Sequence, residues 1–253
     1  MRSTGSRLGQ LFRWVFILVI MIIIAIAITP LNLYYPHVEA QLRPIKLSGI
    51  SGSAVKGSAE NLTYITMPLG EAEWLLYPRS YNALAGEVRV NKQHYDLKFD
   101  INRIEKGLVE VGKIRGFLDW ELIRPYVQMN YGQLAGYAQF NLQGLKYAET
   151  GGLEQLYGDI TLQDFKMLQP SAKDMGTVKL VFETKTKGMI VGTFSSDSQV
   201  LSVSGTLFLQ PNRWQLNLNI IPKGGHFELD AILSSVGDAR RGGGRQLNLA
   251  GFY

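Results

Sequence analysis

The chain has 253 residues, of which 46% are hydrophobic and 19% charged, and a formal net charge of +5. Three of the positive charges are Arg2, Arg7 and Arg13, so the remainder is close to neutral and its charge gives no indication of nucleic-acid binding. Cysteine is absent, which excludes disulfides and thiol nucleophiles.

The N-terminal segment predicts a membrane helix. Residues 15–28 are apolar without interruption, and no charged residue occurs between Arg13 and Glu39. Trp14 and the pair Tyr34-Tyr35 bracket roughly 20 residues, enough for a helix that crosses a bilayer, with aromatic rings near both interfaces. The predicted anchor consists of Trp14, Val15, Phe16, Ile17, Leu18, Val19, Ile20, Met21, Ile22, Ile23, Ile24, Ala25, Ile26, Ala27 and Ile28.

The arginines before this segment predict its orientation. By the positive-inside rule, residues 1–13 stay in the cytoplasm, residues 14–33 form the transmembrane helix, and residues 34–253 are exported. Pro30 is interpreted as the end of the membrane helix. A cleaved secretory signal is the alternative, because Ala25-Ile26-Ala27 after an apolar stretch also fits that template. Both interpretations place the bulk of the chain outside the cytoplasmic membrane, which in a bacterium is the periplasm.

Alternation of apolar and polar residues predicts β-strands after the anchor. In residues 95–102 every odd-numbered residue is apolar and every even-numbered residue is polar. A period of two is typical of antiparallel strands with one covered face and one face in water. The same alternation occurs at residues 201–204, 214–220 and 226–230, with turn residues at 105–107, 210–212 and 222–225.

The positions of the glycines and the low predicted helix content complete the predicted fold. A glycine opens an alternating run at Gly86, Gly136 and Gly158, and more loosely at Gly205. Two short helices are considered, at residues 119–128 and 151–156; the first has Asp119 as N-cap and is interrupted by Pro125. The predicted class is mainly β: an elongated or curved antiparallel sheet of hairpins and meanders with one or two short helices.

No residue pattern indicates catalysis, a cofactor or a metal ion. His37, His94 and His226 are far apart and fit no metal-binding spacing. Glu71 and Glu73 occupy one face of a predicted strand, which is interpreted as solvated. The run of glycines at 242–244 precedes a predicted strand, not a helix, and is interpreted as a loop. We therefore predict that the chain is not an enzyme.

The order of these motifs resembles a known family. The glycine-punctuated run 47–62, followed by a strand that carries Trp74 and Pro78, is similar to the opening of the type II secretion system protein N family. Residues 237–251 resemble that family's closing loop and strand. The residues that carry the resemblance are Gly52, Gly57, Ala59, Leu62, Trp74, Pro78 and Gly86.

This resemblance implies a function. It implies an accessory, single-pass protein of the bacterial inner membrane, without catalytic residues, in the machine that exports folded periplasmic proteins across the outer membrane. Its implied partners are other components of the inner-membrane platform or the secretin, together with membrane lipid. The β-pattern is also similar to the AsmA-like membrane-anchored proteins, which implies lipid binding or transport in an apolar β-groove as the alternative. A periplasmic hydrolase would require residues that only the fold brings together.

Overall fold

The computed structural model describes most of the chain after the predicted anchor. The described residues are 29–123, 133–169, 172–224, 229, 233–234, 237–241 and 243–252. The predicted anchor residues 14–28 lie outside them. From Thr29 onward, no helix in the described residues is long and apolar enough to span a membrane. The chain divides into two compact units, Met1–Tyr77 and Pro78–Tyr253.

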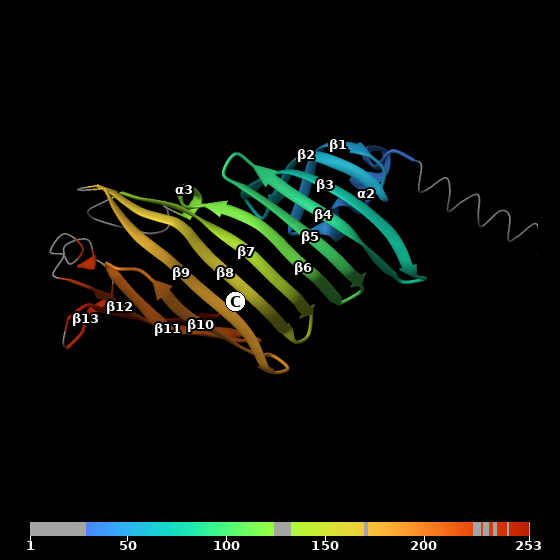
Figure 1. Ribbon diagram of the computed structural model, residues 1–253. Helices are drawn as coiled ribbons and strands as arrows, with labels where there is room; N and C mark the ends of the chain where they lie inside the picture. The colour runs from blue at the N-terminus through green and yellow to red at the C-terminus, as the bar shows by residue number, and fades with distance from the viewer. Residues whose placement is uncertain are drawn as a thin grey trace, which may run out of the picture. The chain divides into compact units, whose positions relative to one another are not determined.

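In the first unit a helix is followed by an antiparallel set of strands (Figure 1). Its elements are α2 (Leu31–Leu42), β1 (Ile45–Gly52), β2 (Lys56–Tyr64) and the start of β3 (Met67–Ser80). Helix α2, which begins directly after Pro30, was not predicted from the sequence. The buried Tyr35 hydroxyl accepts a hydrogen bond from the Leu47 N–H at 2.7 Å, which ties the helix to the edge of β1.

The family motif of this unit is a packing motif around Trp74. Gly57 lies opposite Trp74 in the β2–β3 register, and a Cβ atom at Gly57 would lie only 2.6 Å from Cζ2 of the indole ring. The indole Nε1–H donates a hydrogen bond to the Ser53 carbonyl at 3.0 Å. The next small pair along this face, Ala59 and Ala72, is also in register and buried. Glycine and alanine therefore make room for the indole ring.

The other motif residues are dispersed. Gly52 has a φ of +81°, which favours glycine at the end of β1. Leu62 is half-buried in β2, and Pro78 is exposed in β3. Gly86 is buried in β4 (Ala83–Lys92) of the second unit, with a φ of +149°. The role of these residues as structural motif positions stays a prediction.

Replacing Trp74 by alanine is expected to destabilise the chain by about 2–3 kcal/mol, because the half-buried ring and its hydrogen bond are both lost. The measurement is urea unfolding of the full-length chain in detergent. Tyr77→Ala is the control, because Tyr77 lies in the same strand and is 56% exposed, so its loss should cost under about 0.5 kcal/mol. Equal effects of the two substitutions would show that Trp74 is a surface residue.

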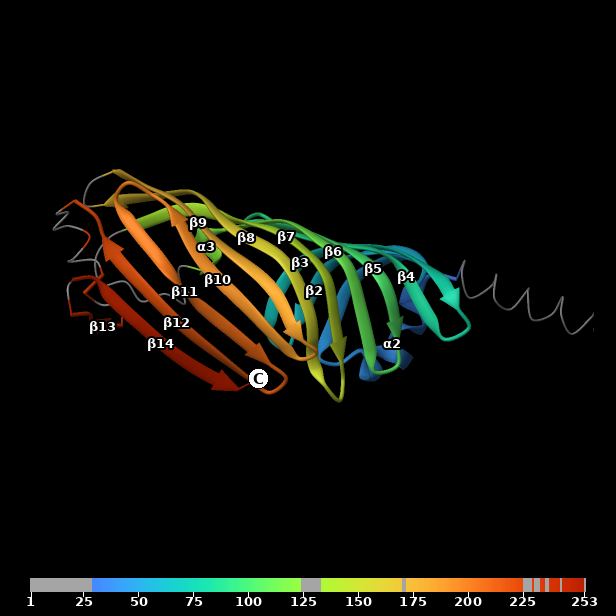
Figure 2. The ribbon, with the colours of Figure 1, turned by 60° about the horizontal axis from the view of Figure 1, so that its bottom comes forward.

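The second unit is an antiparallel sheet in which each strand up to β12 pairs with its neighbour in sequence (Figure 2). Beyond β12 the order continues with β14 and then β13. The strands after β4 are β5 (Tyr95–Glu105), β6 (Leu108–Asp119), β7 (Gln133–Ala148), β8 (Gly152–Gln169), β9 (Lys173–Thr186), β10 (Met189–Asp197), β11 (Leu201–Gln210), β12 (Arg213–Pro222), β13 (Asp238–Ala239) and β14 (Arg245–Phe252).

The mainly β, antiparallel prediction is confirmed, and the strands predicted at 95–102, 201–204 and 214–220 lie within β5, β11 and β12. Helix prediction was less accurate. Of the helix predicted at 119–128, α3 (Trp120–Ile123) is described, with the Asp119 carboxylate accepting the Glu121 N–H at 3.2 Å. Residues 124–128 lie outside the described residues.

Two local predictions were wrong. The helix considered at 151–156 is the start of β8, because Leu153 pairs with Tyr147 of β7 and the sheet supplies its backbone hydrogen bonds. The strand predicted at 226–230 is contradicted at Leu229, which is helical; residues 226–228 and 230 lie outside the described residues. Leu229 and Leu233 are both buried in the same core cluster.

The strand registers align apolar side chains on one face of the second unit, here called the apolar face. Two adjacent rows cross the sheet from β5 to β14 without a polar residue. The first row is Leu97, Gly116, Phe140, Ile160, Leu180, Phe194, Gly205, Leu218 and Leu247. The second row is Phe99, Ile114, Leu142, Gly158, Phe182, Gly192, Leu207, Leu216 and Leu249.

Glycines in these rows let the sheet bend. A Cβ atom at Gly158 would overlap the backbone carbonyl oxygen of Asn141, and Gly158 has a φ of +104°. Phe182 lies opposite Gly158 on one side and Gly192 on the other, and its Cε1 atom lies 3.2 Å from the position of a Cβ atom at Gly192, so the aromatic ring fills the space that Gly192 leaves. The same combination of a glycine and a phenylalanine occurs at Gly116 and Phe140.

The bent sheet brings together strands that are not neighbours. Phe165 and Met167 of β8 share a buried cluster with Leu201 and Val203 of β11. A second cluster runs from β5 to β10 and contains Ile190, which has no exposed surface. The core of the second unit therefore lies on the apolar face, and the opposite face carries the polar residues.

Candidate functional site

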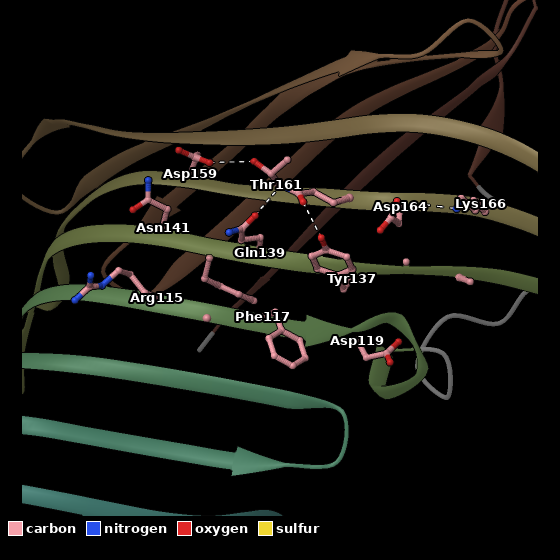
Figure 3. Close-up of a pocket in the computed structure, with 15 residues that line it drawn as sticks. Arg115, Phe117, Asp119, Tyr137, Gln139, Asn141, Asp159, Thr161, Asp164 and Lys166 are labelled. Atoms are coloured by element: carbon pink, nitrogen blue, oxygen red, sulfur yellow. Dashed lines mark hydrogen bonds and ion pairs between the residues drawn. The ribbon is translucent and has the colours of Figure 1, made fainter.

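A pocket of about 1010 Å³ lies on the polar face of β6, β7 and β8 (Figure 3). We call it the polar-face pocket. Its lining combines charged, amide, hydroxyl and aromatic side chains with the small residues Gly116, Ala135 and Gly136. The larger side chains that line it include Arg115, Phe117, Asp119, Tyr137, Gln139, Asn141, Asp159, Thr161, Gln163, Asp164 and Lys166.

The strand registers arrange most of this lining as a grid. Alternate residues of a strand point to the same face, so three positions on each strand contribute. The rows of the grid are Arg115, Asn141 and Asp159; then Phe117, Gln139 and Thr161; then Asp119, Tyr137 and Gln163. The site is therefore built on paired strands, which hold their side chains more rigidly than loops do.

An aromatic pair lies within the grid. The rings of Phe117 and Tyr137 meet edge-to-face, with centroids 6.4 Å apart and planes at 80°. The Tyr137 hydroxyl donates to Oε1 of Gln163 at 2.8 Å, and Nε2 of Gln163 donates to Oε1 of Gln139 at 2.6 Å. This chain of hydrogen bonds orients two amides beside a phenylalanine that is 42% exposed.

The charges around the pocket are paired. Arg115 donates to Asp100 at 2.9 Å, and Lys179 lies 3.6 Å from Asp159. Thr161 Oγ1 also donates to Asp159, at 3.0 Å. Because each of these carboxylates has a cationic partner, the pocket has no concentration of one charge.

One carboxyl beside the pocket has a shifted pKa. Asp96 lies opposite Phe117 in the β5–β6 register and accepts two hydrogen bonds from Arg89, at 2.9 and 2.6 Å. The hydrogen bonding from Arg89 lowers the pKa of Asp96, and the charge of Arg89 adds to the effect. Any stability from this pair is present above the ordinary carboxyl pKa and is lost as the pH falls through the lowered value.

Replacing Arg89 by glutamine is therefore expected to raise the pKa of Asp96 towards its ordinary value. A titration of the aspartate side-chain carboxyl carbons by NMR measures this shift. Lys98→Gln is the control, because Lys98 pairs with Glu87 and not with Asp96. An unchanged Asp96 titration in Arg89→Gln would contradict the assignment of the shift to Arg89.

The residues considered for chemistry from the sequence do not come together. His94 lies in the turn before β5, with Nδ1 3.6 Å from Asp119, and His37 is exposed on α2. His226 lies outside the described residues. Glu71 and Glu73 are exposed on either side of the buried Ala72, which confirms a solvated polar face. Across the described part of the chain no group of three or more metal-binding side chains occurs.

Sequence reasoning missed the polar-face pocket. Each of its strands shows alternation, but the grid depends on which residues of β6, β7 and β8 are opposite each other. The sequence feature that could have indicated this pocket was Phe117, an aromatic residue at a position of β6 where the alternation predicts a polar residue.

The comparison with protein families decides the affiliation of the chain. The family model for type II secretion system protein N matches residues 43–248, more than half of the chain. The chain belongs to the type II secretion system protein N family. The resemblance noted from the motifs is thereby confirmed. No curated protein and no solved structure matches the chain.

Family membership makes this chain a component of the type II secretion system, and so of the bacterial envelope. The match covers the first unit from the end of α2 and continues into β14 of the second unit. It begins after the predicted anchor, so the anchor stays a prediction.

Proposed function

We propose that this protein N is an accessory, non-catalytic component that supports the export of folded periplasmic proteins across the outer membrane through contacts with other secretion proteins. Its partners are components of the inner-membrane platform or the secretin. A single helix, residues 14–33, holds it in the inner membrane with residues 1–13 in the cytoplasm and the β units in the periplasm. The family match and the polar-face pocket support this proposal.

The observation that carries the proposal is the exposed Phe117, which packs on the half-buried Tyr137 beside two hydrogen-bonded amides. Residues that dominate binding energy at protein interfaces are typically aromatic or arginine side chains surrounded by polar groups. Phe117 and Tyr137 have that setting, since the hydrogen-bonded Gln139 and Gln163 lie beside them and Arg115 lies at the next row. A pocket of this kind fits a protein surface that inserts an apolar side chain.

The test is a secretion assay with Phe117→Ala. The substitution removes a ring that is 42% exposed together with its edge-to-face contact with Tyr137, which should cost about 1 kcal/mol of stability. A binding contact of this type contributes about 2 kcal/mol, so binding should weaken roughly 30-fold. We expect folded secretion substrates to accumulate in the periplasm while the chain remains at its normal level. Tyr147→Ala is the control, because Tyr147 is 47% exposed on β7 but does not line the pocket.

Two results would count against different parts of this proposal. Normal secretion in cells that lack the chain altogether would contradict the role in export. Impaired secretion in those cells, with normal secretion for Phe117→Ala, would show that the contact lies elsewhere than the polar-face pocket.

The anchor has its own test. Ile23→Arg should make insertion less favourable by about 2.5–3.5 kcal/mol, because a charge is placed near the bilayer centre. We expect the variant to be released from membranes by alkaline carbonate, whereas Ser3→Arg in the predicted cytoplasmic segment should stay in the pellet. Retention of both variants would contradict the helix assigned to residues 14–33.

The apolar face favours lipid binding as a second candidate function. Many of its members are only partly buried, among them Ile160, Leu180 and Leu216. Described residues outside the strands that pack on it include Leu229, Leu233 and Val200 of one core cluster, and Trp120 of α3, whose ring lies 5.9 Å from that of Phe165. An unbroken, partly exposed apolar surface is suited to acyl chains.

Native mass spectrometry of the full-length chain tests this candidate. Lipid binding predicts co-purified phospholipid that Leu216→Glu displaces and Gln215→Glu retains, because Gln215 is the adjacent, exposed residue on the polar face. Absence of phospholipid from the unmodified chain would discard this function.

A further inference from the structure

The outer edge of β14 is an open strand edge. Along its inner edge β14 pairs with β12 over its whole length, from Arg245 to Phe252. Along its outer edge the only partner in the described residues is β13, where Ala239 and Asp238 lie opposite Arg245 and Gln246. Figure 2 shows β14 as the outermost long strand of the second unit.

The hairpin between β13 and β14 identifies which backbone groups point outwards. The Arg240 N–H donates to the Gly244 carbonyl at 3.2 Å, so Gly244 directs its backbone groups towards β13. In an antiparallel ladder alternate residues direct both their N–H and C=O groups to the same side. Asn248, Ala250 and Phe252 therefore direct theirs to the outer edge, where no partner lies in the described part of the chain.

The outer edge of β1, in the first unit, is covered at one position. The Leu47 N–H of β1 points away from β2 and is hydrogen-bonded by the Tyr35 hydroxyl of α2. Covering an exposed edge is how folded proteins prevent unwanted strand pairing. Asn248, Ala250 and Phe252 of β14 have no such cover in the described residues, so strand pairing is available to them.

The charged and exposed apolar residues near this edge indicate which kind of segment could bind to it. From Arg240 to the end of β14 the chain carries Arg240, Arg241 and Arg245 and no acidic residue. None of these arginines has an ion pair within the described residues. Leu249 is 45% exposed and Phe252 84% exposed on the same strand.

We propose that the edge of β14 from Asn248 to Phe252 binds an extended segment of a partner protein as an additional strand. This inference rests on the proposed function and specifies the kind of partner. Such a segment alternates apolar residues, which extend the apolar face beyond Leu249, with polar ones, and it carries acidic residues at the end beside Arg245. Main-chain hydrogen bonds supply affinity in this binding mode, and side chains at alternate positions supply specificity.

The test uses full-length chain in detergent and a fluorescein-labelled synthetic peptide, with binding measured by fluorescence polarisation. The peptide has eight residues, valine alternating with threonine and two glutamates at one end; its matched peptide has two lysines instead. Ala250→Pro removes an outward N–H and leaves the β12 ladder intact, because proline is tolerated where the N–H of an edge strand faces outwards. Arg245→Glu reverses one of the charges.

We expect the glutamate peptide to bind at least tenfold more tightly than the lysine peptide. Ala250→Pro should weaken its binding at least tenfold with the melting temperature unchanged, and Arg245→Glu should remove the preference for glutamate. Equal binding by Ala250→Pro and the unmodified chain would overturn strand addition. Equal binding of the two peptides would contradict the proposal that the partner segment carries acidic residues.

Two further results decide the identity of the occupant and its link to secretion. A dimer of the full-length chain that Ala250→Pro dissociates would identify a second copy as the occupant and overturn the proposal. If cells without the chain secrete normally, the proposed export function fails, and the peptide result still decides whether β14 accepts a strand.

Discussion

Replacing Gly158 by alanine is expected to destabilise the second unit by about 4 kcal/mol, which corresponds to a fall of roughly 8–16 °C in melting temperature. Two effects combine. The φ of +104° is a conformation that side chains rarely adopt, which costs about 1–3 kcal/mol. The new methyl group would also overlap the Asn141 carbonyl, so β7 and β8 must separate locally, which costs about 1–3 kcal/mol more.

Gly243→Ala provides the matched control for this experiment. Gly243 has a similar φ of +94°, but a Cβ atom there would have no neighbour within 4 Å. Circular dichroism of the full-length chain in detergent measures both melting temperatures. The difference between the two variants isolates the close approach of β7 and β8, and identical melting temperatures would contradict the assignment of Gly158 as a bending point.

Truncating Ile190 to alanine is expected to destabilise the chain by about 3–4 kcal/mol, because the side chain is completely buried and its removal leaves a cavity. Ile190 of β10 shares its cluster with Leu156 of β8 and Phe182 of β9, so the cavity would lie between strands that the bend brings together.

Met189→Ala is the control, since Met189 precedes Ile190 in the same strand and is 40% exposed on the other face. Its truncation should cost under about 1 kcal/mol. Urea unfolding measures both variants. A larger loss of stability for Met189→Ala than for Ile190→Ala would contradict the assignment of Ile190 to the core.

Strand positions were predictable because alternation is a local signal. Residues 95–102 and 214–220 alternate strictly, and both lie within single strands. Glycine-led runs were also informative: a Cβ atom at Gly158 or Gly205 would overlap the backbone of a neighbouring strand. Which residue lies opposite such a glycine could not be predicted, because bulges shift the register, for example between Leu162 and Phe165.

Helices were harder to predict because the contacts that stabilise them join residues that are far apart in sequence. Helix α2 contains Pro36 and no capping side chain, and its buried Tyr35 is held by β1, a contact that the sequence does not reveal. At Leu229 the apolar alternation suggested a strand, but Leu229 is helical and is buried in a core cluster. In both segments, packing outweighed the local pattern.

The candidate site depends on register, and this explains why it was missed. Phe117 and Tyr137 are separated by 20 positions in sequence and meet only because β6 and β7 pair. The family motif was found from sequence because its spacing is local, but its residues are structural: Gly57 and Ala59 make room for Trp74. Packing motifs identified the family, whereas the polar-face pocket could be found only from the fold.

The most direct test of the proposed contact role is photo-crosslinking in living cells. A photoreactive phenylalanine analogue would replace Phe117 in the polar-face pocket, and Tyr147 in a control chain. Mass spectrometry of the adducts should identify another type II secretion component at position 117 and not at position 147. Adducts that contain no secretion component at position 117, in cells that secrete actively, would contradict the claim that this protein N acts through contacts at the pocket.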